Sequence, residues 1–135
     1  MRLLNIESSP RGPRSASISI ANAFIDAYGK ACPALQVDTL NVWEEDLPEF
    51  DGKAYKPLLG IPRALVIHVR GQSHDPSTYA ASPGFAHQAD YLDFWLRFIG
   101  VKEIRRLMVE HTWDGRATET IARGRADAAA MAADF

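Results

Sequence analysis

Four segments of the chain carry the hydrophobic pattern of β-strands. Uninterrupted apolar runs at 3–6 and 64–69 predict parallel strands that are buried on both faces. The alternation over 35–42 is weaker, and arginines interrupt the run at 104–109. These two segments are therefore predicted to be edge strands.

Three further segments, 17–30, about 85–99 and 116–132, have apolar residues at helical spacing. Pro33 and Gly100 are expected to end the first two helices. The positions expected to face inward are Ile20, Ala21, Phe24, Ile25 and Tyr28 in the first helix, Leu92, Trp95, Leu96 and Ile99 in the second, and Ile121, Ala128 and Met131 in the third. The second helix carries three additional aromatic residues, Tyr91, Phe94 and Phe98. They favour a homodimer in which the other face of this helix is buried against a second subunit.

The order β-α-β-loop-β-α-β-α predicts an α/β protein with a parallel sheet and right-handed crossovers. A length of 135 residues suits a single domain, 1–135. The segment 43–63 is an irregular crossover, because its prolines and glycines leave no room for a long helix. Its acidic residues are typical of a solvated face: Glu44, Glu45, Asp46 and Glu49.

The loop between the first strand and the first helix is dense in serine, proline and glycine. A strand that runs through such a loop into a helix is the usual architecture of a phosphate site, because backbone N–H groups and the helix dipole point at the anion. Hydroxyls of Ser9, Ser15 and Ser17 add donors, and Arg11 and Arg14 add charge. A simpler interpretation also stands, in which Ser15 or Ser17 caps the helix and Pro-Arg-Gly-Pro forms a turn.

A second loop, 70–76, follows the strand at 64–69 at the edge where open α/β sheets bind ligands. Its His74–Asp75 pair is either a proton relay or a solvated pair. The histidines lack the tight spacing of metal ligands, and His68 is expected to be a satisfied core residue. No metal site is predicted. The tryptophans are expected to be packing residues: Trp43, Trp95 and Trp113.

Composition and charge narrow the class of protein. Hydrophobic residues make up 47% and charged residues 24%, as in ordinary globular proteins. A net charge of −2 gives no reason to expect binding to nucleic acid or to acidic membranes. A single cysteine, Cys32, excludes an internal disulfide and favours a reducing compartment. With no signal peptide or membrane-spanning run visible, we predict a cytoplasmic protein.

The chain resembles the FMN-dependent NADH azoreductases, a family of flavodoxin-like quinone reductases. Four segments carry the resemblance, and they lie in the family's order over nearly the whole chain: 3–17 with its Ser-Ser-Pro-Arg loop, 46–52, 64–72, and 91–101 with its Phe-Ile-Gly-Val ending. The resemblance implies a flavodoxin-like three-layer sandwich that binds FMN and uses NADH as electron donor.

The resemblance also implies where the cofactor binds. The predicted residues are Ser9, Ser15, Ala16 and Ser17 for the FMN phosphate, with Ala16 acting through its backbone, and Arg70, Gly71 and Gln72 for the isoalloxazine ring. The family favours Ser-Arg-Gly-Gly in the ring loop, whereas this chain has Val69 and Gln72 at the outer positions. Backbone contacts survive these changes, but a serine hydroxyl contact does not. No catalytic side chain is predicted, because the flavin carries the hydride chemistry.

One block of the family is absent between about Gly52 and Tyr55. In the family this block holds a further buried strand, a loop that grips the flavin ring, and helices. The family's strand order is 2-1-3-4-5, so the absent strand is the central one, and about four strands remain. The strand at 64–69 must then pair directly with the strand at 3–6, or another chain must fill the gap.

Three functions follow. In the first, NADH reduces bound FMN, which passes electrons to a quinone or azo compound. In the second, a shortened flavodoxin-like domain is structural, or binds FMN or phosphate weakly, without turnover. In the third, the protein is an FMN reductase or an electron-carrying flavoprotein, because the same phosphate loop serves those classes.

Overall fold

The computed structural model describes residues 1–45, 62–72 and 87–135. Strands and helices alternate along these residues in the predicted order. The chain divides into two compact units, Met1–Glu49 with Ile121–Phe135 and Phe50–Thr120, and each is described by itself. The single domain over 1–135 stays a prediction. Most of the predicted crossover at 43–63 lies outside the described residues.

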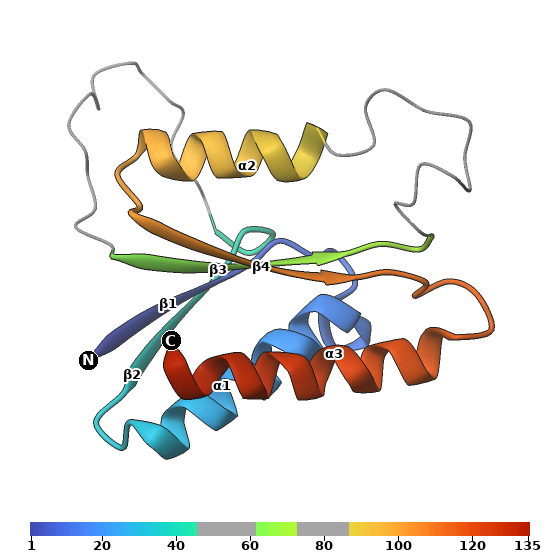
Figure 1. Cartoon of the computed structure of the whole chain (residues 1–135), viewed down its shortest axis with the longest axis horizontal. Helices are drawn as coiled ribbons and strands as arrows, with labels where there is room; N and C mark the ends of the chain where they lie inside the picture. The colour runs from blue at the N-terminus through green and yellow to red at the C-terminus, as the bar shows by residue number, and fades with distance from the viewer. Residues whose placement is uncertain (46–61, 73–86) are drawn as a thin grey trace. The chain divides into compact units, whose positions relative to one another are not determined.

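The first unit starts with a parallel β-α-β arrangement. β1 (Arg2–Glu7) and β2 (Gln36–Asn41) pair in parallel, with Leu3 opposite Val37. The helix α1 (Ala16–Ala31) connects the two strands and is drawn in blue in Figure 1. Among the described residues β2 pairs with β1 alone, but each of the four described strands has a single partner, so the edge strands at 35–42 and 104–109 stay a prediction.

The core of this unit is built on one face of α1. Ile20, Phe24 and Tyr28 follow one another at intervals of four and are 0%, 4% and 7% exposed, as the helical spacing predicts. The rings of Phe24 and Tyr28 stack with centroids 5.6 Å apart. Phe135 follows the 3-10 turn η2 (Ala132–Asp134) and meets both rings edge-on, at 5.0 and 5.8 Å. The end of the chain therefore closes the core around its first helix.

The second unit contains the other pair of parallel strands. β3 (Arg63–Val69) and β4 (Glu103–Val109) pair with Ala64 opposite Ile104. The helix α2 (His87–Phe98) connects them and runs along this sheet in Figure 1. The helix α3 (Ala117–Met131) begins in this unit and continues into the first.

Gly100 ends α2, as predicted. Its φ of +103° lies in the left-handed region that favours glycine. The N–H of Gly100 donates to the carbonyl of Arg97, and the N–H of Val101 donates to the carbonyl of Leu96, each at 3.0 Å. These two bonds form a Schellman motif, which satisfies carbonyls in the last turn of the helix.

The four strands do not join into one sheet within the described residues. β1 pairs with β2 and β3 pairs with β4, in two separate two-stranded sheets. The expected direct pairing of 64–69 with 3–6 is therefore not found. Each strand keeps the partner to which its own crossover helix connects it. Completion of the sheet by another chain stays a prediction.

The prediction that 3–6 and 64–69 are buried on both faces is wrong. Leu4 and Ile6 in β1 are 48% and 60% exposed, while the alternate residues of the strand are half-buried. In β3 only His68 is buried. A parallel strand is buried on both faces only where helices cover both, and the described residues cover one face of β1.

The outer face of α2 carries an exposed aromatic stripe. Its members recur at i, i+3, i+4 and i+7 and are between 46% and 66% exposed: Tyr91, Phe94, Trp95 and Phe98. The inward position predicted for Trp95 is therefore wrong, because this residue shares the outer face with Tyr91. None of the described helices is long and apolar enough to cross a membrane.

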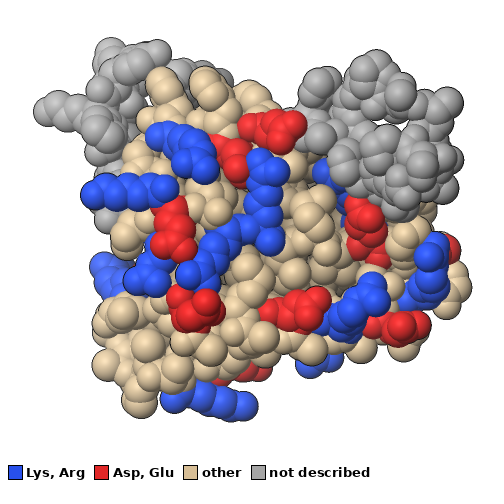
Figure 2. Space-filling view, in the orientation of Figure 1, with Lys and Arg blue, Asp and Glu red and all other residues tan. Residues whose placement is uncertain are grey.

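Charged side chains of both signs are interspersed on the face drawn in Figure 2. This distribution accords with a net charge of only −2. The predicted absence of nucleic-acid and membrane partners stays a prediction.

Candidate functional site

The loop after β1 turns sharply into α1. The Ser9 hydroxyl accepts a bond from the N–H of Arg11 at 3.4 Å. Gly12 has a φ of +51° and opens a 3-10 turn, Gly12–Arg14 (η1), after which the N–H of Ser15 donates to the Gly12 carbonyl at 2.9 Å. Glycine at position 12 lets the chain reverse direction at low steric cost. The predicted turn is therefore present.

Ser15 is the N-cap of α1, with its hydroxyl accepting from the N–H of Ile18 at 3.4 Å. Its residue is 4% exposed. This confirms the capping interpretation for Ser15 and not for Ser17. The N–H groups of Ala16 and Ser17, in the first turn, have no acceptor within the helix.

The hydroxyl oxygens of Ser15 and Ser17 lie 2.9 Å apart, so the pair uses one of their two hydroxyl hydrogens. Ser15 already accepts from Ile18 and is nearly buried, which favours Ser15 as the donor to Ser17. The hydrogen of the half-buried Ser17 is then available to an anion. The donor set of this loop, two N–H groups and a hydroxyl at a helix N-terminus, fits a phosphate.

Trp43 fastens the start of this loop, a role that the sequence did not indicate. Its indole N–H donates to the carbonyl of Ser8 at 3.0 Å, and the N–H of Val42 donates to the carbonyl of Glu7 at 3.0 Å. Trp43 is 64% exposed, so the expectation of a packing residue is wrong for it.

The second predicted loop begins at Arg70, after β3. The Arg70 N–H donates to the carbonyl of Val109 at 2.8 Å. The Arg70 carbonyl accepts from the N–H of Thr112 at 3.1 Å and from its hydroxyl at 2.8 Å. The Arg70 guanidinium is largely buried and lies 4.0 Å from a carboxylate oxygen of Glu110. The backbone of this loop is therefore bound to the loop after β4.

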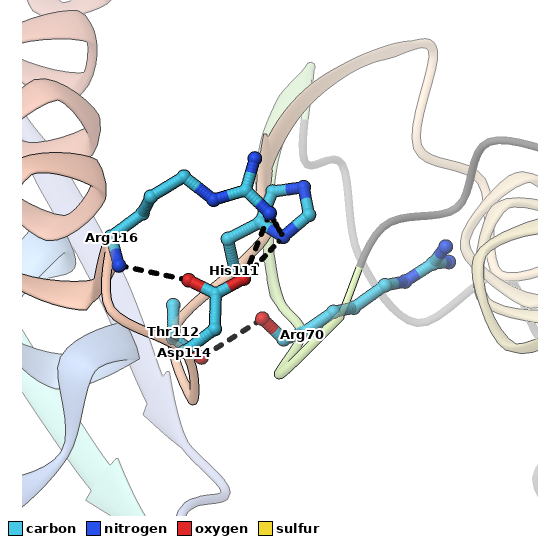
Figure 3. A network of polar contacts seen from close by, with 5 residues as sticks. All are labelled: Arg70, His111, Thr112, Asp114 and Arg116. Atoms are coloured by element: carbon cyan, nitrogen blue, oxygen red, sulfur yellow. Dashed lines mark hydrogen bonds and ion pairs between the residues drawn. The ribbon is translucent and has the colours of Figure 1, made fainter. Parts of the chain in front are cut away.

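A polar cluster stabilises the loop after β4 (Figure 3). Asp114 accepts from the backbone N–H of Arg116 and from its guanidinium, each at 2.9 Å. These bonds from Arg116, first that of its guanidinium, lower the pKa of Asp114 to about 2. His111 Nδ1 lies 2.8 Å from Asp114 Oδ2 and 2.7 Å from a guanidinium nitrogen of Arg116. An Nδ1 that carries no hydrogen accepts from the guanidinium, and an Nδ1 that carries a hydrogen donates to the carboxylate. This atom therefore makes one of the two bonds at a time.

Trp113 projects from this loop beside Gly71. A Cβ built on Gly71 would lie 3.2 Å from the Cβ and 3.3 Å from the Cγ of Trp113. The absence of a side chain at position 71 therefore accommodates the tryptophan. Trp113 is 81% exposed, so it is not the packing residue that the sequence led us to expect.

His68 is buried, at 5% exposure, but its Nε2 has no hydrogen-bond partner among the residues that the structure describes. The prediction that His68 is a core residue is therefore confirmed, whereas the prediction that its side chain is fully hydrogen-bonded is wrong. Burial lowers the pKa of His68, the positive charges of Arg70 and Arg106 lower it further, and the carboxylate of Asp93 opposes them. Asp93 and Arg106 themselves form an ion pair at 2.6 Å between α2 and β4.

The predicted cofactor residues fall into two groups. Ser9, Ser15, Ala16 and Ser17 lie together in the first unit, and Arg70, Gly71 and Gln72 lie together in the second. The His74–Asp75 pair, Asp46 and Glu49 lie outside the described residues, whereas Glu44 and Glu45 are exposed. Within the described part of the chain, no group of His, Cys, Asp and Glu side chains is arranged to hold a metal ion.

The β-α-β start with its serine loop, followed by a second parallel pair of strands, is the arrangement of a flavodoxin-like α/β protein. A family model described as a flavodoxin-like fold matches residues 1–63. FMN-dependent NADH:quinone oxidoreductase 2 of Burkholderia lata is 44% identical over 207 aligned positions, which cover 100% of both chains. The chain belongs to the family of FMN-dependent NADH:quinone oxidoreductases.

A second relative and two solved structures are also similar to this chain. FMN-dependent NADH:quinone oxidoreductase 9 of the same organism is 27% identical, covering 93% of this chain and 94% of the relative. Among solved structures, an FMN-dependent NADH-azoreductase from Bacillus anthracis in complex with FMN matches with a TM-score of 0.75 over 98% of each chain, at 13% identity. An azoreductase from the Sterne strain of that organism matches with a TM-score of 0.73 over 100% of each chain, at 16% identity. The match to these structures shows that this chain shares their fold, which accords with the flavodoxin-like family model.

The alignment with the Burkholderia relative is longer than this chain. It extends over 207 positions, whereas the chain has 135 residues. Part of the relative therefore has no counterpart here, as expected from the absent block.

Proposed function

We propose that this protein is an FMN-dependent oxidoreductase that passes electrons from NADH to quinones or azo compounds. The observation that carries the proposal is the 44% identity to an FMN-dependent NADH:quinone oxidoreductase over the whole of both chains. Bound FMN accepts the hydride and passes its electrons on, while the protein holds and orients the flavin. No side chain needs to act as acid or base.

The serine loop is the proposed site of the FMN phosphate. The N–H groups of Ala16 and Ser17 and the hydroxyl of Ser17 are its proposed donors, supported by the 2.9 Å contact between Ser15 and Ser17, which leaves one hydroxyl hydrogen available. Ser9 borders the same turn. Exposed Arg11 and Arg14 add positive charge, which favours a dianionic phosphate at the helix N-terminus.

The loop Arg70–Gly71–Gln72 is proposed to line the isoalloxazine ring through its backbone. The bonds of Arg70 to Val109 and Thr112 support this role, because they hold the loop backbone in one conformation before any ligand arrives. With Val69 and Gln72 at the outer positions, no serine hydroxyl contributes there.

A homodimer is proposed on the aromatic stripe of α2. Phe94 and Phe98 stack with centroids 6.3 Å apart and are 65% and 60% exposed, and so large an apolar helix face is typical of an interface. Phe94→Glu is expected to halve the mass measured by light scattering, whereas an unchanged mass places the dimer elsewhere or excludes it. We also propose a cytoplasmic location, consistent with NADH as donor and one unpaired cysteine, Cys32.

The first experiment is reconstitution. Protein incubated with FMN and separated from excess flavin should retain the visible flavin spectrum, and NADH should then be oxidised on addition of a quinone. Retained flavin without NADH oxidation would favour the second candidate function, a shortened domain without turnover. That candidate is supported by the alignment positions that have no counterpart here. Failure to retain any flavin contradicts the proposed function.

A second experiment tests the serine loop. Aspartate and asparagine are both good N-caps of nearly the same size, so Ser15→Asp and Ser15→Asn differ mainly in charge. We expect Ser15→Asp to bind FMN about tenfold more weakly than Ser15→Asn, because its carboxylate repels the phosphate. Riboflavin, which lacks the phosphate, should bind the two variants equally. Equal FMN affinities would mean that the loop is only a turn and a cap.

A further inference from the structure

We propose that Trp113 is a stacking surface for the isoalloxazine ring of FMN. The proposal rests on the proposed function, and it adds a residue that neither the sequence pattern nor the resemblance assigns to the flavin site. Every residue on which it is argued lies in the unit Phe50–Thr120.

The position of the indole is the first observation. The Cβ, Cγ and Cδ2 atoms of Trp113 lie 3.2, 3.3 and 3.5 Å from where a Cβ of Gly71 would stand, so one side of the residue rests against the loop proposed to line the ring. At 81% exposure, most of its surface is open to solvent. A planar ring bound along Arg70–Gln72 thus meets an aromatic surface at its border.

The second observation is that the loop holding Trp113 is fixed on both sides of it. Thr112, the preceding residue, makes two bonds to the Arg70 carbonyl, at 3.1 and 2.8 Å. Asp114, the following residue, is bound by the backbone and guanidinium of Arg116. His111 adopts a φ of +62°, an unusual conformation for a residue with a side chain.

A single exposed tryptophan needs no explanation by itself. An exposed tryptophan between two anchored neighbours is different, because the backbone entropy of the loop is already lost and a ligand need not order it again. The electron-rich indole stacks favourably on an electron-poor ring such as an oxidised flavin. In this chain the block that grips the flavin ring in the family is absent, and Trp113 supplies a ring contact from another part of the fold.

The test uses the full chain and compares two variants with the wild type. Trp113→Ala removes the ring, and Trp113→Phe keeps an aromatic ring at the same position. We expect Trp113→Ala to weaken FMN binding about tenfold and Trp113→Phe to restore most of the affinity. The midpoint of thermal unfolding should not change in Trp113→Ala, because the indole is mainly exposed.

Spectroscopy supplies a readout that does not depend on turnover. FMN should quench the tryptophan fluorescence of the wild type, and this quenching should fall markedly in Trp113→Phe. Stacking should also give the bound flavin a long-wavelength absorption shoulder that is absent from Trp113→Ala.

The outcomes separate the two proposals. If the wild type binds no FMN, the proposed function fails and the stacking role fails with it. If the wild type binds FMN but Trp113→Ala binds it equally well and keeps the absorption shoulder, only the stacking role is overturned. If FMN affinity is unchanged while the KM for the quinone rises, the indole contacts the acceptor ring, and the flavin assignment of Trp113 is wrong.

Discussion

The hydroxyl oxygen of Ser15 lies 2.9 Å from that of Ser17, yet only Ser15 caps α1. Two serines that look equivalent in the sequence therefore have different roles. Ser15, which is 4% exposed, caps the helix, whereas the half-buried Ser17 is the residue proposed to donate its hydroxyl hydrogen to the phosphate. One residue maintains the shape of the loop, and the other has the proposed role in binding.

This division predicts opposite effects of two alanine substitutions. Ser15→Ala should lower the free energy of unfolding by about 1 kcal/mol, the usual cost of losing an N-cap. Ser17→Ala should change stability far less but weaken FMN binding. Urea unfolding and FMN titration of both variants check this, and a larger loss of stability in Ser17→Ala would contradict the assignment of the cap.

His68 predicts a loss of stability in mild acid. Its pKa is lowered in the folded protein, first by burial and then by Arg70 and Arg106. The unfolded chain therefore binds the proton more readily, and the free energy of unfolding should fall as pH drops below about 6.5, the ordinary pKa of histidine.

His68→Leu isolates this effect. The substitution removes the buried Nε2, which has no hydrogen-bond partner among the described residues. It should therefore flatten the dependence of the free energy of unfolding on pH between about 5 and 7. Urea unfolding at several pH values is the measurement. A slope that persists unchanged in the variant would assign the effect to another group.

Asp114 predicts a second, more acidic transition. Its pKa of about 2 lies below the ordinary aspartate value of 3.8, because Arg116 binds the ionised form. The stabilising contribution is complete above about pH 4 and is lost as pH falls toward 2. Carboxyl chemical shifts measured by NMR should give Asp114 a midpoint near 2. A midpoint near 4 would mean that the contacts with Arg116 do not persist in solution.

Local patterns predicted much of this fold. The inward positions of α1 and the stop at Gly100 follow from helical spacing and from C-cap chemistry, both of which act within a few residues. The burial of β1 was predicted wrongly, because burial depends on what covers a strand from elsewhere in the chain. Leu4 has the same sequence neighbours whether or not a helix lies over it.

The loop residues were the hardest to predict. Trp113 follows His111, which has a left-handed φ, and Thr112, which is bonded to Arg70 some forty residues earlier in the chain. Hydrophobic periodicity carries no information about such contacts. The hydrophobic pattern placed the loop that starts at Arg70 at the ligand-binding edge of the sheet, whereas its role in lining the flavin ring came from the family resemblance and stays a prediction.

Among the described residues of its own unit, β1 has a hydrogen-bonding partner on one side only, β2, and this has a consequence for the hydrogen exchange of its backbone. The N–H groups of Gln36 and Val42 donate to the carbonyls of Met1 and Glu7, which sets the phase of the β1–β2 ladder. In a parallel ladder with that phase, the amides of Leu4 and Ile6 point away from β2. Hydrogen exchange along β1 should therefore alternate between slow and fast residues, whereas a central strand flanked on both sides would protect every amide. If a further strand, from this chain or from another, paired with the edge of β1 that faces away from β2, the alternation would be lost.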